Sequence, residues 1–309
     1  MAALDVVGLG LSTVDILLRQ SDMPTWERGG RIRDLCFDGG GPVGTALAAA
    51  ARLGAHAGYV GTCGNDAVAA LRLQFLTRYG IDVSRVVTRP APEKQVIIVY
   101  VQADCGERVF ASAPMGDVAL KPEELDREYI TSAAYLHLDG FHLEAALQAA
   151  LWMHAAGKTV VLDAGKTRGE ISPGMQSLVA VTDILICGSG FGPALTGKQD
   201  LWQAGEEILG RGPRLVVQTE GADGCYTTTP SERFHTLAFK VEVVDTTGAG
   251  DVFHGAYIFG LLQGWDYPTI ARFATAMSAI KCTCLGGRSG IPGFAEVQKF
   301  LEIRGKEIE

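Results

Sequence analysis

Short runs of apolar and β-branched residues alternate along this chain with longer stretches of helical character. Six such runs stand out, at Leu4–Leu9, Gly58–Gly61, Ala134–Leu138, Thr159–Asp163, Asp183–Cys187 and Arg214–Thr219. Parallel strands need crossover connections of a dozen or more residues, and these are usually helices. The alternation therefore predicts an α/β fold of three layers, α/β/α, in which helices cover both faces of a mainly parallel central sheet.

Two segments interrupt this rhythm, at Gly30–Asp38 and Gln95–Ala111. The second has the pattern of a hairpin with a turn at residues 103–106. We predict a small antiparallel sheet beside the core, with strands from about residues 12–38 and 94–113, within a single domain that spans residues 1–309. Such a sheet could close over a site as a lid, and its exposed edge could form the contact of a homodimer.

The charge balance argues against a nucleic-acid partner. The 309 residues include 27 Lys and Arg against 35 Asp and Glu, which gives a formal net charge of −8. A protein that binds nucleic acid by neutralising many phosphates carries a positive surface instead.

The apolar stretches and the cysteines predict a soluble protein of the cytoplasm, with no membrane partner. Residues 1–10 lack a basic segment ahead of a long apolar run, and the longest apolar stretches are too short to span a bilayer. The seven cysteines are odd in number and lack C-x-x-C spacing, so we expect reduced thiols.

The strongest chemical signal is the run Val244–Ala256, which places a small-residue turn directly before a helical, apolar stretch. We predict that a helix begins within this turn. Free N–H groups at a helix N-terminus bind anions such as phosphate oxygens, and here they belong to Gly248–Gly250. Asp251 falls in the first turn, where a carboxylate can accept a proton from an attacking hydroxyl. The alternative is that Asp245 and Asp251 are an ordinary N-cap and first-turn acid.

This run resembles the second signature of the PfkB carbohydrate kinases, the ribokinase-like family. The matching positions are Asp245, Thr246, Gly248, Ala249, Gly250, Asp251, Gly255 and Ala256, and the likeness extends from Gly8 to Pro292. The resemblance implies a kinase that uses ATP and Mg²⁺, with Asp251 as the base and residues 248–250 stabilising the transferred phosphoryl group. It also implies a site for a monovalent cation such as K⁺ at Asp245 and Thr247, and a homodimer formed through the lid.

Two further stretches predict the side of the site that binds a small sugar-like substrate. Asp15 follows the first strand, at the carboxyl edge where open α/β sheets bind ligands; the alternative is a lone surface acid. The turn Asp38–Ala46 resembles the first PfkB signature, although Gly44 replaces its usual Asn. The substrate contacts predicted in this way are Asp15, Gly39, Gly40, Gly41, Gly44 and Asp139.

The nucleotide side is predicted from a glycine-containing turn after the strand at Arg214–Thr219. Thr219, Gly221 and Gly224 match the family's T-x-G-x-x-G loop, with a plain hairpin as the alternative. Thr275 lies on a small-residue helix that resembles the wall beside the adenine. The family's N-x-x-E stretch is replaced by residues 188–191, which lack the Glu that helps to organise Mg²⁺. Asp163, Lys166 and Arg168 could compensate in part, as phosphate or metal-shell groups; the favoured alternative is a plain charged loop.

Three residues near the site carry plainer predictions. His254 is predicted to pack beside the site rather than to transfer a proton, because hydroxyl phosphorylation needs one base and positioned cations. Arg288, in the closing loop Gly286–Pro292, is predicted to face solvent, and Gly290 lies where some family members have a ligating Ser.

The acceptor stays open among ribose, a ketohexose, a 2-keto-3-deoxy sugar acid and a nucleoside. Residues 39–42, 281–283 and 286–288 and the sequence around His254 resemble bacterial sulfofructose kinases, yet Phe141 and His142 stand where a sulfonate clamp is expected. A nucleotide- or sugar-binding protein without turnover is the competing class. A Rossmann dehydrogenase is disfavoured, because Thr13 stands where the third glycine of its motif belongs.

Overall fold

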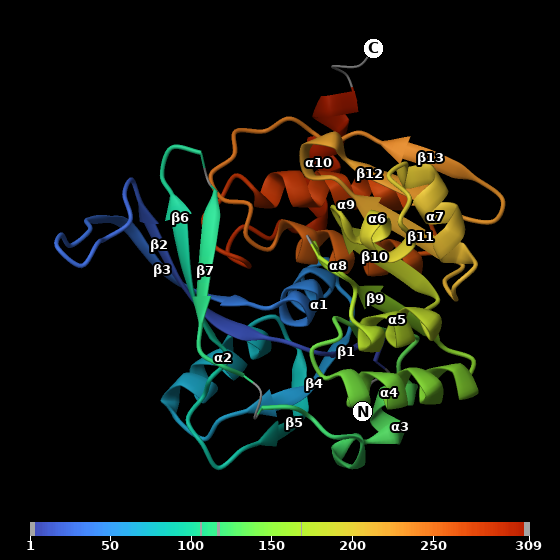
Figure 1. Ribbon diagram of the computed structural model, residues 1–309, viewed down its shortest axis with the longest axis horizontal. Coiled ribbons are helices and arrows are strands. Elements are labelled where there is room, and N and C mark those ends of the chain that lie inside the picture. Colours follow the sequence, from blue (N-terminus) through green and yellow to red (C-terminus); the bar gives the residue numbers. More distant parts are fainter. Residues whose placement is uncertain (1–3, 106, 116–117, 168, 306–309) are drawn as a thin grey trace.

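The computed structural model describes residues 4–105, 107–115, 118–167 and 169–305 and arranges them around two sheets (Figure 1). Within these residues, sheet A has the strand order β13-β12-β11-β10-β9-β8-β1-β4-β5. Its strands are β1 (Val6–Leu9), β4 (Ala57–Cys63), β5 (Asp82–Thr88), β8 (Tyr135–Leu138), β9 (Thr159–Asp163), β10 (Ile184–Gly188), β11 (Leu215–Thr219), β12 (Cys225–Thr228) and β13 (Arg233–Thr236). Neighbouring strands from β5 to β11 are parallel, and β12 and β13 run antiparallel. The predicted mainly parallel α/β core is confirmed.

Helices cover both faces of sheet A, because alternate side chains of a buried strand point to opposite faces. In β9, Val161 joins one apolar cluster, whereas Val160 and Leu162 join the other. The first cluster includes residues of α1 (Pro42–Leu53), α2 (Ala67–Thr77), α8 (Ala249–Leu262), α9 (Tyr267–Lys281) and α10 (Phe294–Gly305). The second includes residues of α3 (Arg127–Ser132), α4 (Leu143–Ala155), α5 (Pro173–Ala180), α6 (Phe191–Thr196) and α7 (Leu201–Leu209). Short 3₁₀ helices lie at Pro122–Glu124 and Gly221–Asp223.

Two kinds of helix start bear on the site. Five helices begin at an Asp or Ser whose side chain accepts a hydrogen bond from the first turn, namely α2, α3, α5, α7 and α9. In contrast, α1 and α8 begin at Gly41 and Gly248, which have no side chain to act as a cap. At α1, Pro42 has no N–H group and Gly44 N donates to Leu11 O (3.1 Å), whereas at the start of α8 only Ala249 N has a partner among the described residues, Thr246 O (3.3 Å). The start of α8 is therefore the one of these two that offers N–H groups to a ligand.

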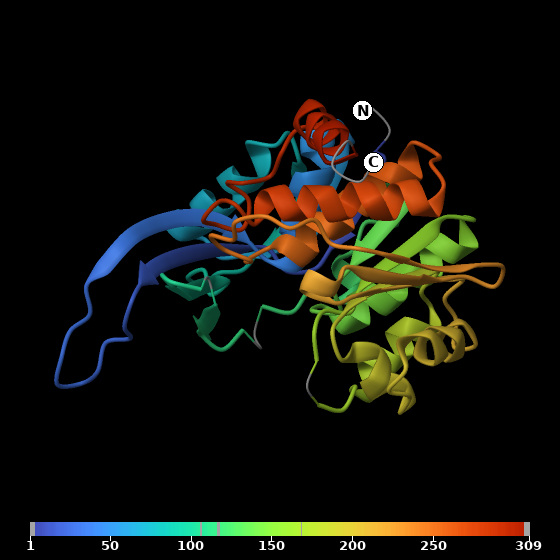
Figure 2. The ribbon, with the colours of Figure 1, turned by 90° about the horizontal axis from the view of Figure 1, so that it is seen from above.

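Sheet B projects from the core (Figures 1 and 2) and consists of β3 (Ile32–Gly40), β2 (Thr13–Gln20), β6 (Val96–Gln102) and β7 (Arg108–Ser112), in that order. Both β2–β3 and β6–β7 are antiparallel, but β2 and β6 are parallel. The prediction of an antiparallel sheet was therefore wrong in its central pair. The chain passes through the core between β3 and β6, so it re-enters sheet B in the same direction as β2. The predicted turn at residues 103–106 includes Gly106, which lies outside the described residues.

Candidate active site

A pocket of about 310 Å³ lies where the carboxyl ends of β9, β10 and β11 meet the start of α8 and the strands of sheet B. Its lining comprises Leu11, Thr13, Gly41, Pro42, Ile97, Arg108, Phe110, Asp163, Gly165, Lys166, Gly188, Thr219, Thr247, Gly248, Gly250, Asp251 and His254. A depression of about 460 Å³ surrounds the turn between β12 and β13, at the opposite edge of the strands. Because ligands of open parallel sheets bind at the carboxyl edge, the first pocket is the candidate site.

The start of α8 forms one wall of this pocket, as the sequence predicts. Gly248 adopts the left-handed conformation with φ 77°, and a Cβ atom there would lie 2.7 Å from the carbonyl oxygen of Gly287. A Cβ atom at Gly250 would meet nothing within 4 Å, so the backbone at this point faces open space. Asp251 follows in the first turn of the helix and lines the pocket. The bare backbone at Gly250 and the Asp251 carboxylate therefore face the same space.

Asp251 has an unusual electrostatic environment. Burial raises its pKa well above the usual value of 3.8, the nearby Asp163 carboxylate raises it further, and the Arg108 guanidinium opposes the shift. No side chain of the described residues donates a hydrogen bond to Asp251, so its oxygens stay free to accept a proton. His254, one turn further along α8, has a pKa lowered to about 3 by burial and is a neutral imidazole.

Asp15 is buried beside the pocket and does not line it. Its carboxylate accepts a hydrogen bond from the Thr13 hydroxyl (2.5 Å), and Thr13 is the residue that reaches the pocket surface. Burial raises the pKa of Asp15 to about 6, and the bond from Thr13 and the charge of Arg288 oppose this. A Cβ atom at Gly40 would clash with the Asp15 carboxylate, which explains a glycine at that position.

Asp139 acts on the backbone around it. Its carboxylate oxygens accept hydrogen bonds from the N–H groups of Leu11 (2.8 Å) and Phe141 (2.9 Å). Burial raises its pKa to about 6. Asp139 does not line the pocket among the described residues, so its observed contact is the loop that carries Leu11.

The predicted glycines of the first signature lie at different depths. Gly41 lines the pocket, where it begins α1 with φ 83°. Gly39 and Gly44 instead adjoin the Arg288 guanidinium, with which a Cβ atom at either position would clash. The unusual glycine at position 44 therefore makes room for an arginine.

Arg288 is fully buried, so the prediction that it faces solvent was wrong. Its side chain donates hydrogen bonds to Gly40 O (2.5 Å), Ser12 Oγ (3.1 Å) and Thr45 Oγ1 (3.3 Å). Its backbone N–H donates to Asp38 Oδ2 (2.8 Å). Arg288 thereby joins the closing loop to the chain that carries the predicted substrate contacts.

Of the predicted nucleotide-side residues, Thr219 and Lys166 line the pocket, whereas Gly221, Gly224 and Thr275 do not. Gly221 and Gly224 have positive φ and shape the turn between β11 and β12. The Thr275 hydroxyl donates to Ala271 O (2.7 Å) within α9. Arg168 lies outside the described residues.

The structure accounts for the missing N-x-x-E pattern. A Cβ atom at Gly188 would lie 2.6 Å from Lys166 Cγ, so the lysine side chain fills the space beside β10. Phe191 is buried in the apolar cluster on the second face of sheet A. This chain has thus exchanged polar groups for a basic side chain and a core residue.

The predicted cation site has a protein cation close to it. The Asp245 carboxylate accepts hydrogen bonds from Thr247 N (2.8 Å), Thr247 Oγ1 (2.7 Å) and Gly286 N (2.9 Å). The buried Lys281 ammonium donates to the backbone carbonyl of Asp245 (3.0 Å). Burial lowers the pKa of Lys281, and the Asp245 charge opposes this shift.

Sheet B contributes pocket residues that sequence reasoning missed, namely Ile97, Arg108 and Phe110. The Arg108 guanidinium lies over the Phe110 ring, 5.6 Å from its centroid, and donates to Thr246 Oγ1. The Nε atom of Arg108 is buried and has no partner among the described residues. Alternation along β7 places Arg108 and Phe110 on one face, but the pattern alone does not say which face meets the pocket.

The chain resembles known proteins along nearly its whole length. The profile of the pfkB family carbohydrate kinases matches residues 4–293. The chain is 28% identical to the 5-dehydro-2-deoxygluconokinase of Shouchella clausii, over 96% of this chain and 95% of that protein.

Solved structures share the fold. A putative ribokinase from Agrobacterium tumefaciens superposes with a TM-score of 0.89 at 24% identity, covering 99% of both chains. A putative ribokinase II from E. coli, solved in complex with ATP and Mg²⁺, superposes with a TM-score of 0.83 at 22% identity, covering 97% of this chain and 99% of that one. No helix in the described part of the chain is both long and apolar enough to cross a membrane.

Proposed function

Because this chain belongs to the pfkB family of carbohydrate kinases, we propose that Asp251 is the base that deprotonates the acceptor hydroxyl during phosphoryl transfer. The observation that carries the proposal is one wall of the pocket. There, a carboxylate free of donors stands one residue after the bare backbone of Gly250. The N–H groups at residues 248–250 face the transferred phosphoryl group, and the helix dipole stabilises its negative charge.

ATP is the proposed phosphoryl donor, with Mg²⁺ as its counter-ion. The exposed Lys166 and Thr219 line the side of the pocket away from sheet B and would hold the phosphates. Mg²⁺ prefers oxygen ligands and usually keeps several waters, so phosphate oxygens and waters would fill most of its coordination shell. When bound, the ion neutralises charge that develops on the phosphates. The E. coli structure that contains ATP and Mg²⁺ supports this assignment.

Sheet B is the proposed lid. Arg108, Phe110 and Ile97 reach the pocket from β6 and β7, so movement of this sheet changes access to Asp251. Closure would exclude water, which otherwise competes with the acceptor hydroxyl.

Arg108 supports a sugar acid as the acceptor class. Its guanidinium lies in the pocket near Asp251, and its buried Nε has no partner among the described residues. A planar guanidinium matches a carboxylate through two hydrogen bonds. The name of the relative from Shouchella clausii, 5-dehydro-2-deoxygluconokinase, also supports an acidic acceptor.

The test is ADP release with Mg-ATP across sugar acids, pentoses, ketohexoses, sulfosugars and nucleosides. We expect turnover with a sugar acid, and we expect Arg108→Met to raise its KM roughly 10–100-fold, because a hydrogen bond to a charged group contributes about 1.5–3 kcal/mol. Arg33→Met is the matched control, since Arg33 lies on sheet B away from the pocket and pairs with Asp104. Preference for a neutral sugar or a nucleoside in the wild type would reject the acidic acceptor. ATP binding without turnover on any acceptor would favour a binding protein.

We also propose a homodimer through sheet B. The two edge strands of this sheet, β3 and β7, expose apolar side chains. Ile32, Leu35, Phe37 and Val109 are each 45–62% exposed. Exposed apolar patches of this kind mark contact surfaces. We expect the wild type to elute at twice the chain mass of 32.8 kDa and the Leu35→Glu, Phe37→Glu double variant at the single mass, in light scattering after gel filtration. A wild-type monomer at working concentration would refute the dimer.

We propose that Lys281 takes the place of the predicted monovalent cation. Its ammonium already places a positive charge against the Asp245 carbonyl, where the sequence predicts K⁺. We expect activity to be equal in potassium and tetramethylammonium salts, and Lys281→Met to lower kcat about 10-fold, or about 1.4 kcal/mol, with partial rescue by K⁺. Lys299→Met, on the exposed side of α10, is the control. Strong K⁺ activation of the wild type would show that Lys281 does not replace the ion.

A cytoplasmic location is proposed on two grounds. All seven cysteines are free thiols, as expected in a reducing compartment. A kinase of this class also needs the ATP that the cytoplasm supplies.

A further inference from the structure

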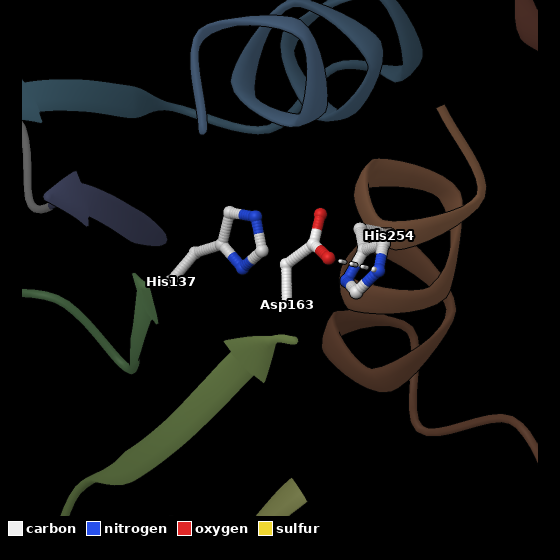
Figure 3. A group of neighbouring side chains, drawn as sticks. All are labelled: His137, Asp163 and His254. Atoms are coloured by element: carbon white, nitrogen blue, oxygen red, sulfur yellow. Dashed lines mark ion pairs between the residues drawn. The ribbon is translucent and has the colours of Figure 1, made fainter. Parts of the chain in front are cut away.

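Directly beneath the pocket, His137 of β8, Asp163 of β9 and His254 of α8 point toward one another (Figure 3). His137 and Asp163 lie on neighbouring parallel strands, two rungs apart, on the face that packs against α8. One ligand-type atom from each side chain lies within 4.8 Å of the other two. His254 Nε2 is 3.4 Å from Asp163 Oδ1.

Three of the four ring nitrogens of this cluster are buried and have no partner among the described residues. The exposed fractions of His137, Asp163 and His254 are 0%, 6% and 4%. These three nitrogens are Nδ1 and Nε2 of His137 and Nδ1 of His254. Buried polar atoms in native proteins almost always have partners, so this cluster calls for a missing one.

The chemistry of the three side chains selects the missing partner. Two imidazoles and one carboxylate form a ligand set that suits divalent first-row transition metals, whereas Mg²⁺ prefers oxygen ligands only. Bonds of about 2.0–2.2 Å set ligand atoms roughly 3.4 Å apart in a tetrahedral site, so small side-chain rotations suffice to close this one. Asp163 and His254 also line the pocket, which gives an ion a path of entry.

We infer that His137, Asp163 and His254 bind a divalent transition-metal ion of the zinc class. Asp163 Oδ1 already accepts a hydrogen bond from Gly165 N (2.8 Å), which orients the carboxylate within the cluster. The ion would join α8 to β8 and β9 one helical turn below Asp251. It would therefore fix the position of the proposed base relative to the sheet. This site does not rest on the proposed kinase mechanism.

The test uses Co²⁺ as the probe, with the full chain stripped by chelator and then kept in excess Mg²⁺. We expect one Co²⁺ per chain after desalting, with visible d–d absorption typical of nitrogen ligands. His137→Asn, His254→Asn and Asp163→Asn should each weaken Co²⁺ binding beyond the roughly 10–100-fold that a change outside the ligand shell causes. His142→Asn is the matched control, because His142 is buried but binds Leu120 N through its Nδ1 atom.

Two wild-type measurements keep the inference testable if a variant fails to fold. Stoichiometric Zn²⁺ should raise the melting temperature of the stripped protein in the presence of Mg²⁺. Anomalous scattering at the cobalt edge should place the ion between the three side chains. Absence of bound Co²⁺ in the wild type, or an anomalous peak elsewhere, would overturn the site and leave a hydrogen-bonded cluster.

Discussion

Asp251→Asn should lower kcat by about 10²–10⁴-fold, the range that a positioned general base contributes, and leave ATP affinity within a few-fold. The amide cannot accept the acceptor's proton, but it keeps the size of the side chain and the anion-binding backbone of α8. Single-turnover kinetics and ATP titration measure the two quantities separately. Asp266→Asn is a matched control, since Asp266 also stands at a helix start but caps α9 through Thr269 N (2.8 Å). Full turnover in Asp251→Asn would exclude this base.

The same variant, Asp251→Asn, also tests how the Asp251 carboxylate affects the stability of the fold. The pKa of Asp251 is raised in the folded state, so its ionised form opposes folding at neutral pH. Asp251→Asn should therefore melt at the same or a higher temperature than the wild type at pH 7.5. The difference should shrink as the pH falls from the raised pKa toward the usual value of 3.8, and it should vanish below that value, because the wild-type carboxyl is then protonated in both states. A variant that melts well below the wild type would show a structural role instead.

The activity of the wild type should decrease at low pH. The base must be ionised to accept a proton, so kcat of the wild type falls as the pH drops through the raised pKa of Asp251. The positive charge of Arg108 lowers that pKa. The acid limb of the Arg108→Met profile should therefore move to higher pH.

The interior of sheet A was predictable from sequence, whereas its edges were not. Strands β9 and β10 are buried on both faces, so their continuous apolar runs predict them. The order of sheet A ends at β5 and β13, and these two strands escaped prediction. Both are largely exposed or half-buried along their length, which removes the continuous apolar run that marks an inner strand.

Some residues of the site could be predicted from a local sequence motif, whereas others come together from distant parts of the sequence. Gly248 and Asp251 belong to one turn, so the local pattern locates them. Arg288 and Gly44 lie 244 residues apart in sequence, and no local pattern says that a charged side chain there is buried. The set His137, Asp163 and His254 is likewise assembled from three separate elements. Packing, rather than propensity, creates these contacts.

Arg288→Met should destabilise the protein by about 3–5 kcal/mol, the cost of removing one partner from a buried ionic network. The substitution preserves apolar volume but removes the donors to Gly40 O, Ser12 Oγ and Thr45 Oγ1. It also removes the positive charge that balances the buried Asp38 and Asp15. Urea unfolding measures the loss, with the exposed Arg272→Met of α9 as the control. A loss below 1 kcal/mol would mean that waters or neighbouring groups replace the guanidinium.

Gly44→Asn tests the same contact from the opposite side. The new side chain would clash with the Arg288 guanidinium and approach Ser12 Oγ, 2.6 Å from the added Cβ. Alone, it should destabilise by about 1–3 kcal/mol through overpacking. In the Arg288→Met background the flexible thioether yields more readily, so the double variant should lose less than the sum of the single losses, by about 0.5–3 kcal/mol. Strict additivity of the two losses would show that Gly44 is required by the backbone turn and not by the arginine beside it.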